Sequence, residues 1–507
     1  MKKNIAVEKK YLLVPVNAER GTKIVSFSCD NNKIYEFAVS MDDKKGGFYN
    51  FNYYAPLNVE AYMGKEMVIE GEVPESFLDA VTFSDSMPAN IQSRPLIHFT
   101  PNTGWMNDPN GLVYQNGVYQ MFFQHNPFDT RWENMCWGHA VSKDLIHWEQ
   151  VDTALFPDED GTMFSGGAIV NERGLLGLPE DSQIYFYTCA GGSNAWSKGK
   201  KFTQKIAYST DGGKTVHKKE GCIVDNFVEG NRDPKVYWHE ETNAYYMVLY
   251  LDGNDFMILR SDDLQNCETS QKLTFKDAWE CPDMRQIPIE GGGSKWLFWS
   301  ADGFYYLGDF DGYEFKTDGV KHLAYRNKLP YAAQTYWGPE DVITIPWLRS
   351  ENKGKMYTGG MGIPRKLTLA ETEKGLMLRQ LPVDGYENCK VLMHSSEGKE
   401  NVSYTIQKEC ALEIDINMEK AGDFAVDLYG TSVNYLSSLG KLCVGNQIVD
   451  YGKNLNDFVI IADGEFVEIS ADNGLVLAIV EIESDRKSGI VNIETSANSK
   501  VVLYRAE

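Results

Sequence analysis

Three acidic residues of this 507-residue chain have neighbours that could give each carboxylate a different chemical task. Asp108 lies in the sequence Trp-Met-Asn-Asp-Pro-Asn-Gly, Asp233 lies between Arg232 and a proline, and Glu280 lies between a tryptophan and a cysteine. A proline follows each acid, directly or after one residue, and proline fixes a turn and excludes a helix interior. We therefore expect the carboxylates at strand ends with little freedom. A nucleophile, a fixed anion and a proton donor are the groups that glycoside hydrolysis needs.

The surroundings of these acids predict different protonation states. The tryptophan and cysteine beside Glu280 indicate a partly apolar site, which would favour the protonated carboxyl. The positive charge of Arg232 is expected to hold Asp233 ionised. A plainer interpretation also stands, because Asn-Asp-Pro-Asn-Gly is a good turn sequence and Glu280 could be a surface acid.

Composition excludes several other classes of protein. The chain has 49 basic and 72 acidic residues, a net charge of −23 that would repel nucleic acid and anionic membranes, so neither is expected as a partner. No stretch approaches the ~18 unbroken apolar residues of a membrane span. Without a His-Glu-x-x-His or Cys-x-x-Cys pattern, we expect no metal and no cofactor. Nine cysteines, and no apolar segment after the two N-terminal lysines, predict a cytoplasmic protein with reduced thiols.

A weak repeat in the middle of the chain indicates the elements that must hold these acids. Asp144, Asp211, Asp263 and Asp311 each follow a strand-like stretch and begin a turn, at spacings of roughly 50–70 residues. Such spacing, with several strands in each unit, is typical of propeller blades. Four unrelated hairpin turns in another all-β protein would give the same pattern.

The flanking regions also favour β-structure. Residues 1–90 show short alternating strands, and the prolines at 88 and 95 predict a linker after them, so we expect a small N-terminal β-rich module. Residues 385–507 alternate clearly, for example at 411–416 and 466–469, and carry an Asn-Gly turn at 473–474. This pattern is typical of an antiparallel β-sandwich.

The three acidic segments resemble, in order and spacing, the signature motifs of glycoside hydrolase family 32, the invertase, inulinase and levanase family. Further blocks resemble that family at 98–101, 122–127, 136–140, 164–167, 331–336 and 364–368, so the resemblance runs from about residue 98 to the C-terminus. It implies an all-β fold, with a five-bladed β-propeller catalytic domain at 91–372 and a β-sandwich at 385–507. The module at 1–90 is an addition to the compact family pattern.

The resemblance also implies a role for each acid. Asp108 matches the nucleophile of a retaining mechanism, Glu280 the general acid/base and Asp233 the transition-state stabiliser. Further matched positions that would contact a fructosyl ring are Asn107, Gln124, Trp132, Ser165 and Arg232. For Trp132, a core position under a blade is the alternative. The sequence departs from the family at 339–341 and 359–363, where the family shapes the leaving-group subsites.

The implied substrate is a small molecule or oligosaccharide with β-fructofuranosyl units. The leading hypothesis is a hydrolase that releases fructose from the non-reducing end of sucrose or of inulin- or levan-type oligosaccharides. A fructosyltransferase with the same catalytic residues is the first alternative, and a catalytically silent fructan-binding protein, which would lack one of the acids, is a remote one. The N-terminal module could wall the cleft, bind sugar or only pack. It and the sandwich are the two surfaces through which a homo-oligomer could form.

Overall fold

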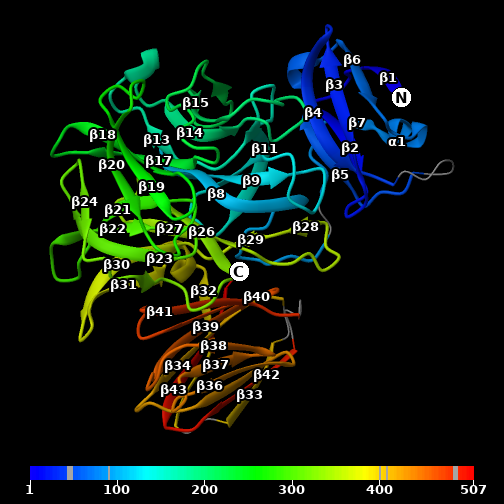
Figure 1. The fold of residues 1–507 in the computed structure, drawn as a ribbon. Helices are drawn as coiled ribbons and strands as arrows, with labels where there is room; N and C mark the ends of the chain where they lie inside the picture. Colours follow the sequence, from blue (N-terminus) through cyan, green and yellow to red (C-terminus); the bar gives the residue numbers. More distant parts are fainter. Residues whose placement is uncertain (43–48, 90–91, 399–400, 407–408, 484–488, 507) are drawn as a thin grey trace.

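The structure is a computed structural model, and it describes residues 1–42, 49–89, 92–398, 401–406, 409–483 and 489–506. Figure 1 shows three β-rich parts: an N-terminal module in blue, a central propeller from cyan to yellow, and a C-terminal sandwich in orange and red. Helices are short in the described residues, namely α1 (Glu75–Ala80), α2 (Asp384–Asn388), and the 3₁₀ turns η1 (Glu60–Tyr62) and η2 (Leu175–Gly177). The predicted fold class is confirmed.

The N-terminal module consists of two facing antiparallel sheets around one apolar core. Side chains of β3 alternate between buried and more exposed positions, as expected for a half-buried strand. The core of the module continues into the propeller, because Phe128 and Cys136 pack into the same apolar cluster. The boundary predicted between residues 90 and 91 lies outside the described residues. One sheet contains β1 (Lys2–Ala6), β6 (Glu66–Gly71), β3 (Thr22–Cys29) and β4 (Asn32–Ser40), and the other β5 (Tyr53–Asn58), β2 (Tyr11–Val16) and β7 (Thr82–Ser84).

Five separate sheets follow one another around the propeller, each forming one blade. Blade 1 contains β8 (Gly104–Gln115), β9 (Val118–Asn126), β10 (Cys136–Ser142), β11 (Trp148–Leu155) and β28 (Tyr357–Thr358). Blade 2 contains β12 (Thr162–Met163), β13 (Ala168–Val170), β14 (Gln183–Ala190), β15 (Phe202–Ser209) and β16 (His217–Lys218). Blade 3 contains β17 (Arg232–His239), β18 (Ala244–Tyr250), β19 (Asp255–Ser261) and β20 (Glu268–Thr274).

The last two blades have the same plan. Blade 4 contains β21 (Asp283–Pro288), β22 (Ser294–Trp299), β23 (Phe304–Phe310), β24 (Phe315–Thr317) and β25 (His322–Leu323). Blade 5 contains β26 (Pro330–Thr335), β27 (Ile343–Leu348), β29 (Gly360–Met361), β30 (Arg365–Thr372) and β31 (Gly375–Pro382). The predicted interval 91–372 stops one strand short of this sheet, because β31 forms a hairpin with β30 across a turn that begins at Thr372.

The four repeated aspartates lie at equivalent turns, where the third strand of a blade leads to the outer strand. Asp144 Oδ1 accepts hydrogen bonds from the backbone N–H groups of Ile146 and His147, at 2.9 and 2.8 Å. Asp263 and Asp311 accept two backbone N–H groups in the same way, and Asp211 accepts that of Thr215. The repeat therefore belongs to blades 1–4 of the propeller and is not a set of unrelated hairpins.

The C-terminal sandwich packs its apolar core between two six-stranded sheets. One sheet contains β32 (Lys390–Gly398), β43 (Ser499–Ala506), β34 (Ala411–Met418), β39 (Asp457–Asp463), β40 (Phe466–Ala471) and β41 (Val476–Glu481). The other contains β33 (Asn401–Ile406), β42 (Gly489–Thr495), β35 (Phe424–Leu428), β36 (Thr431–Leu436), β37 (Lys441–Val444) and β38 (Gln447–Asp450). The turn between β39 and β40 faces the propeller, where Asp463 Oδ2 lies 3.0 Å from Nδ1 of the buried His98.

Candidate active site

A cleft of about 370 Å³ lies where the inner strands of the five blades meet, and it brings together all eight residues predicted for the site. β8 and β9 of blade 1 carry Asn107, Asp108 and Gln124, and β17 of blade 3 carries Arg232 and Asp233. Loops of blades 1, 2 and 4 supply the other three predicted residues, Trp132, Ser165 and Glu280, and β26 and β27 of blade 5 add Tyr331 and Trp347. The complete lining is Asn107, Asp108, Gln124, Trp132, Phe164, Ser165, Arg232, Asp233, Glu280, Tyr331 and Trp347.

Asp108 lies where the pairing of β8 with β9 is interrupted. The register shifts between Met106 and Pro109, so the strand is irregular at this carboxylate. The Ser165 hydroxyl donates a hydrogen bond of 2.6 Å to Asp108 Oδ2. Burial raises the pKa of Asp108, and the nearby charge of Glu280 adds to that effect, while Ser165 acts in the opposite direction. Ser165 therefore orients Asp108 and favours its ionised form.

Asp233 is held in a strained backbone conformation. Its φ is +65°, in the left-handed region that residues other than glycine seldom adopt, and Glu280 and Cys281 share this feature with φ of +47° and +40°. The backbone N–H of Asp233 donates to the Thr188 hydroxyl at 2.9 Å. The backbone N–H of Cys281 donates to Asp233 Oδ2 at 3.0 Å. These contacts hold Asp233 against the segment that carries Glu280, so they fix these two acids relative to each other.

Arg232 joins Glu280 more closely than Asp233, which the sequence did not indicate. Its Nη2 donates to Glu280 Oε1 at 2.5 Å, whereas its Nε lies 3.8 Å from Asp233 Oδ2. Burial raises the pKa of Asp233 to about 7, since the opposing effect of Arg232 is smaller and Asp108 and Glu280 add negative charge nearby. Arg232 lowers the pKa of Asp233, as expected, but burial outweighs this effect and leaves the carboxyl only partly ionised near neutral pH.

Glu280 receives a hydrogen bond on each carboxylate oxygen. Arg232 donates to Oε1, and the Tyr331 hydroxyl donates to Oε2 at 2.7 Å. Burial and the charge of Glu280 raise the pKa of Tyr331, so the phenol keeps the proton that it donates. The apolar surroundings expected from the neighbouring residues do not form, because Trp279 is 47% exposed and the Glu280 side chain is 33% exposed.

Cys281 contacts the other two acids instead of tuning Glu280, which was its expected effect. Its thiol lies 3.4 Å from Asp108 Oδ2 and 3.5 Å from Asp233 Oδ2, where it can donate to either. Burial and these carboxylates raise the pKa of the thiol well above its ordinary value. Cys281 is thus a protonated neighbour that connects the two acids, and it is poorly suited to act as a nucleophile.

The neutral lining residues are oriented by bonds to the propeller. Gln124 donates to the carbonyl oxygen of Met163 at 2.9 Å, and Asn107 Oδ1 accepts from the Trp105 indole at 2.8 Å. Trp132 lies at the rim, 51% exposed and edge-on to Phe164, with ring centroids 6.0 Å apart. It does not occupy the core position that was the alternative for this residue.

Three lining residues were not predicted as site residues, namely Phe164, Tyr331 and Trp347. Phe164 and Tyr331 lie in blocks that carry the family resemblance, but no local pattern distinguishes them from core aromatics. Trp347 follows the first departure from the family pattern. Neither 339–341 nor 359–363 lines the cleft itself; Gly360 packs closely against Phe466 of the sandwich. The expected influence of these two segments on the leaving-group subsites stays a prediction.

The described residues contain no cluster of three or more His, Cys, Asp or Glu side chains that could hold a metal ion. In the same part of the chain, no helix has the length and the apolar character needed to cross a membrane.

Comparison with known proteins identifies the family. The model of the glycosyl hydrolases family 32 N-terminal domain matches residues 98–382. The chain belongs to glycosyl hydrolase family 32. Among curated family members, it is 32% identical to a levanase of Bacillus subtilis over 64% of this chain and 53% of that protein. It is 35% identical to an extracellular exo-inulinase of Meyerozyma guilliermondii over 70% of this chain and 74% of that protein.

An invertase of Debaryomyces hansenii is 35% identical over 58% of this chain and 59% of that protein, so the chain spans little more than half of this invertase and of the levanase. Family 32 structures share its fold. An exo-inulinase of Aspergillus awamori superposes with a TM-score of 0.73 at 21% identity, over 83% of this chain and 99% of that one. A Schwanniomyces occidentalis fructofuranosidase solved with fructose superposes with a TM-score of 0.71 at 24% identity, over 83% and 99%.

Proposed function

We propose that this family 32 protein is a retaining glycoside hydrolase that releases fructose from the non-reducing end of sucrose or of β-fructan oligosaccharides. One observation carries the proposal: the carboxylates of Asp108, Asp233 and Glu280 converge in one cleft, and each is held by a different set of donors. The relatives named levanase, invertase and exo-inulinase support the same substrate class.

The reaction proceeds through two displacements. Asp108 attacks the anomeric carbon of the fructosyl unit while Glu280 gives its proton to the departing glycosidic oxygen, so one C–O bond forms as another breaks. Glu280 then takes a proton from water, and that water attacks the same carbon and frees Asp108. Fructose leaves with its original anomeric configuration, because the carbon is inverted twice.

The other cleft residues act on charge and position. Asp233, when ionised, stabilises the oxocarbenium-like positive charge that develops on the ring and accepts hydrogen bonds from fructose hydroxyls. Ser165 holds Asp108 on the line of attack. Arg232 and Tyr331 orient Glu280 toward the leaving oxygen. Trp132, at the rim, offers an apolar face to the sugar ring.

A direct assay tests the proposed function. Purified protein is given sucrose, a β-2,1-linked oligomer and a β-2,6-linked oligomer, and initial rates of fructose release are compared. Free fructose as the main product at high sucrose supports the hydrolase. Trisaccharides and longer products would instead favour the fructosyltransferase, which differs only in using a sugar hydroxyl in place of water. No conversion of any of the three substrates would contradict both.

Two substitutions test the roles of the acids. Asp108→Asn and Glu280→Gln should each lower kcat by at least 10³-fold, since each removes a group that takes part in bond formation or proton transfer. Circular dichroism and thermal unfolding should show intact variants. Near-normal turnover in either variant would remove the assignment. Fructose release by the parent protein would exclude the silent fructan-binding protein.

We also propose that the enzyme works in the cytoplasm. No disulfide joins any of the nine cysteines, all of which lie in the described residues, and this suits a reducing compartment. Short imported oligosaccharides are the expected substrates there.

A further inference from the structure

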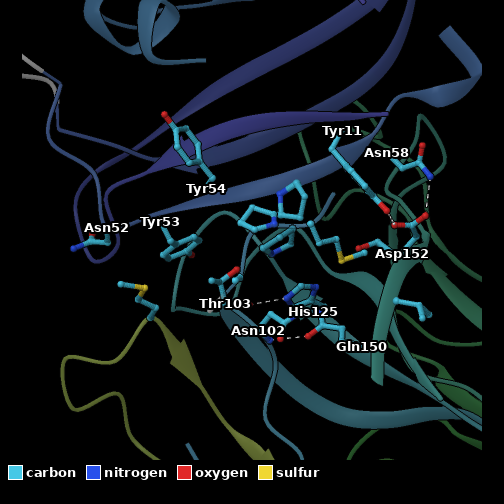
Figure 2. Close-up of a pocket in the computed structure, with 18 of the residues that line it drawn as sticks. Tyr11, Asn52, Tyr53, Tyr54, Asn58, Asn102, Thr103, His125, Gln150 and Asp152 are labelled. Carbon is cyan, nitrogen blue, oxygen red and sulfur yellow. Dashed lines mark hydrogen bonds between the residues drawn. The ribbon is translucent and has the colours of Figure 1, made fainter. Parts of the chain in front are cut away.

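A second cavity lies between the N-terminal module and blade 1 of the propeller, and Figure 2 shows its lining. Its volume is about 250 Å³. β2 and β5 of the module form one side, and β9, β11 and the segment leading into β8 form the other. None of its lining residues lines the catalytic cleft. The two spaces lie on either side of β9, where Gln124 lines the cleft and the next residue, His125, lines the cavity.

Aromatic side chains make up much of the cavity wall. The module contributes Phe51, Tyr53 and Tyr54 from one segment, and Tyr11 and Phe156 complete the wall from β2 and blade 1. Aromatic rings present broad apolar faces together with polar tips, which suits a ligand that has both C–H surfaces and hydroxyl groups. An empty gap left by imperfect packing between the module and the propeller would instead be lined by aliphatic side chains, with few polar atoms in its wall.

Two buried polar atoms of this lining have no hydrogen-bond partner, namely the Tyr53 hydroxyl and Nδ1 of His125. The two residues are only 6% and 3% exposed. Nε2 of His125 bonds to the carbonyl oxygen of Thr103 at 2.9 Å, so the ring proton lies on Nε2 and Nδ1 is an acceptor. Buried polar atoms are normally paired, because leaving them unpaired is unfavourable. Both atoms are enclosed in the present conformation. A ligand hydroxyl that donates to His125 and a second polar group that meets Tyr53 would satisfy this pair once the two rings turn toward the cavity.

The charged group of the cavity is already neutralised by the protein. The Tyr11 hydroxyl and the Asn58 amide donate to the two oxygens of Asp152, at 2.7 and 2.8 Å (Figure 2). Lys10 lies 3.2 Å from the same carboxylate. Gln150 accepts the backbone N–H of Asn102 at 2.6 Å through its carbonyl oxygen, which leaves its amide nitrogen as a further donor. The cavity therefore favours a neutral ligand that carries several hydroxyl groups.

From these contacts we infer that the cavity is a second, non-catalytic sugar-binding site, which takes one neutral sugar ring between the N-terminal module and the propeller. The volume lies just below the ~300–1,000 Å³ of typical small-molecule sites, so a single ring fits and a chain does not. The ring is either a free sugar or the terminal unit of an oligosaccharide that extends into solvent. This inference does not depend on the proposed catalytic function, because the two sites share no residue.

Equilibrium dialysis with the full-length Asp108→Asn variant tests the inference, since sugar survives unhydrolysed in that variant. Labelled sucrose, labelled fructose and a labelled β-2,1-linked trisaccharide are used as probes. Two bound sugars per chain are expected at saturation. Tighter binding of the trisaccharide than of fructose to the second site identifies an oligosaccharide end, and equal binding identifies a free sugar. Only one bound sugar per chain with every probe, at an affinity that Tyr53→Phe leaves unchanged, would overturn the inference.

Tyr53→Phe assigns the second sugar to this cavity. The substitution removes a hydroxyl that has no protein partner, so the melting temperature should stay equal or rise, while affinity at the second site falls about 5- to 10-fold. The matched control is Tyr336→Phe, which removes another buried, unpartnered hydroxyl, from a residue outside both linings. Unchanged binding of both sugars in Tyr53→Phe would contradict the assignment. Loss of the first site with the second site unchanged would contradict it as well.

Discussion

At the scale of single residues, one cation, Arg232, lies among the three acids of the cleft and affects their protonation and orientation. Arg232 lies 2.5 Å from Glu280 and 3.8 Å from Asp233, and its guanidinium stacks 4.6 Å over the Tyr250 ring. The pKa of Asp233 is about 7 even with this cation nearby, because burial outweighs the attraction. Asp233 must be ionised to stabilise positive charge, so its titration should control activity on the acid side.

We predict that kcat/KM rises with pH up to about 7, as Asp233 loses its proton. In Arg232→Gln the pKa of Asp233 should rise further, because the opposing positive charge is gone, and the acid limb of the kcat/KM profile should move to higher pH. Arg232→Lys is the matched control, since it retains a positive charge and should move the limb less. A limb that stays in place in Arg232→Gln would contradict the prediction.

The site was predictable residue by residue, but its contacts were not. Motif order indicated Asp108, Asp233 and Glu280, since each lies in a short segment of distinctive residue types. The pairing of Arg232 with Glu280 joins blades 3 and 4 and depends on how the inner strands converge. Sequence adjacency instead favoured the pair Arg232–Asp233. Tyr331, which donates to Glu280, comes from blade 5, more than fifty positions away along the chain. This contact likewise depends on how the inner strands converge.

At the scale of elements, close backbone approaches between strands and loops set the position of the nucleophile. Gly166 follows Ser165, and a Cβ atom there would lie 1.8 Å from the carbonyl oxygen of Phe186 in β14. The carbonyl of Gly166 also accepts the backbone N–H of Gly111 at 2.9 Å, which ties this loop to β8. Only glycine allows blades 1 and 2 to approach this closely beside Asp108.

Gly166→Ala should therefore lower both stability and activity. The added methyl group must push the loop away from β14, at a cost of about 1–3 kcal/mol in the free energy of unfolding, and it should displace Ser165 from Asp108. Urea unfolding and kcat measure the two effects. Gly21→Ala is the control, because a Cβ there meets nothing within 4 Å. Equal stability of the two variants would argue against the close approach.

The blade repeat was visible in sequence only where a side chain closes the turn. Asp144, Asp211, Asp263 and Asp311 mark four blades because their carboxylates accept backbone N–H groups. The corresponding turn of blade 5 uses Thr372, whose hydroxyl donates to the carbonyl oxygen of Gly375. A repeat of aspartates could therefore count four blades, while the fifth required the family resemblance.

At the scale of the whole molecule, a buried ionic network joins the propeller to the sandwich. His98 lies 3.0 Å from Asp463 and 3.3 Å from Glu468, and Arg365 pairs with Glu468 as well. The two carboxylates raise the pKa of His98 to about 9 against the opposing effect of burial, and Arg365 and His98 lower that of Glu468 to about 2. The charged forms of these groups stabilise the folded junction.

The network predicts how stability depends on pH. The contribution of His98 is complete below its unfolded pKa of about 6.5 and is lost as pH rises through about 9, an effect on the order of 3 kcal/mol. The contribution of Glu468 is present above about 4.5 and is lost as pH falls toward 2. The melting temperature should thus fall between pH 6.5 and 9.

His98→Gln tests this origin. The variant should be less stable than the parent at pH 6, because Asp463 and Glu468 lose their shared cation, and its melting temperature should change less between pH 6.5 and 9. An identical slope in both proteins would show that other groups cause the decline.

The anomeric configuration of the released sugar tests the central claim most directly, because double displacement at Asp108 makes a definite prediction. Proton NMR spectra recorded within the first minutes of sucrose cleavage, before mutarotation, should show β-fructofuranose as the initial product. Initial release of the α-anomer would show a single displacement by water and would contradict Asp108 as the nucleophile.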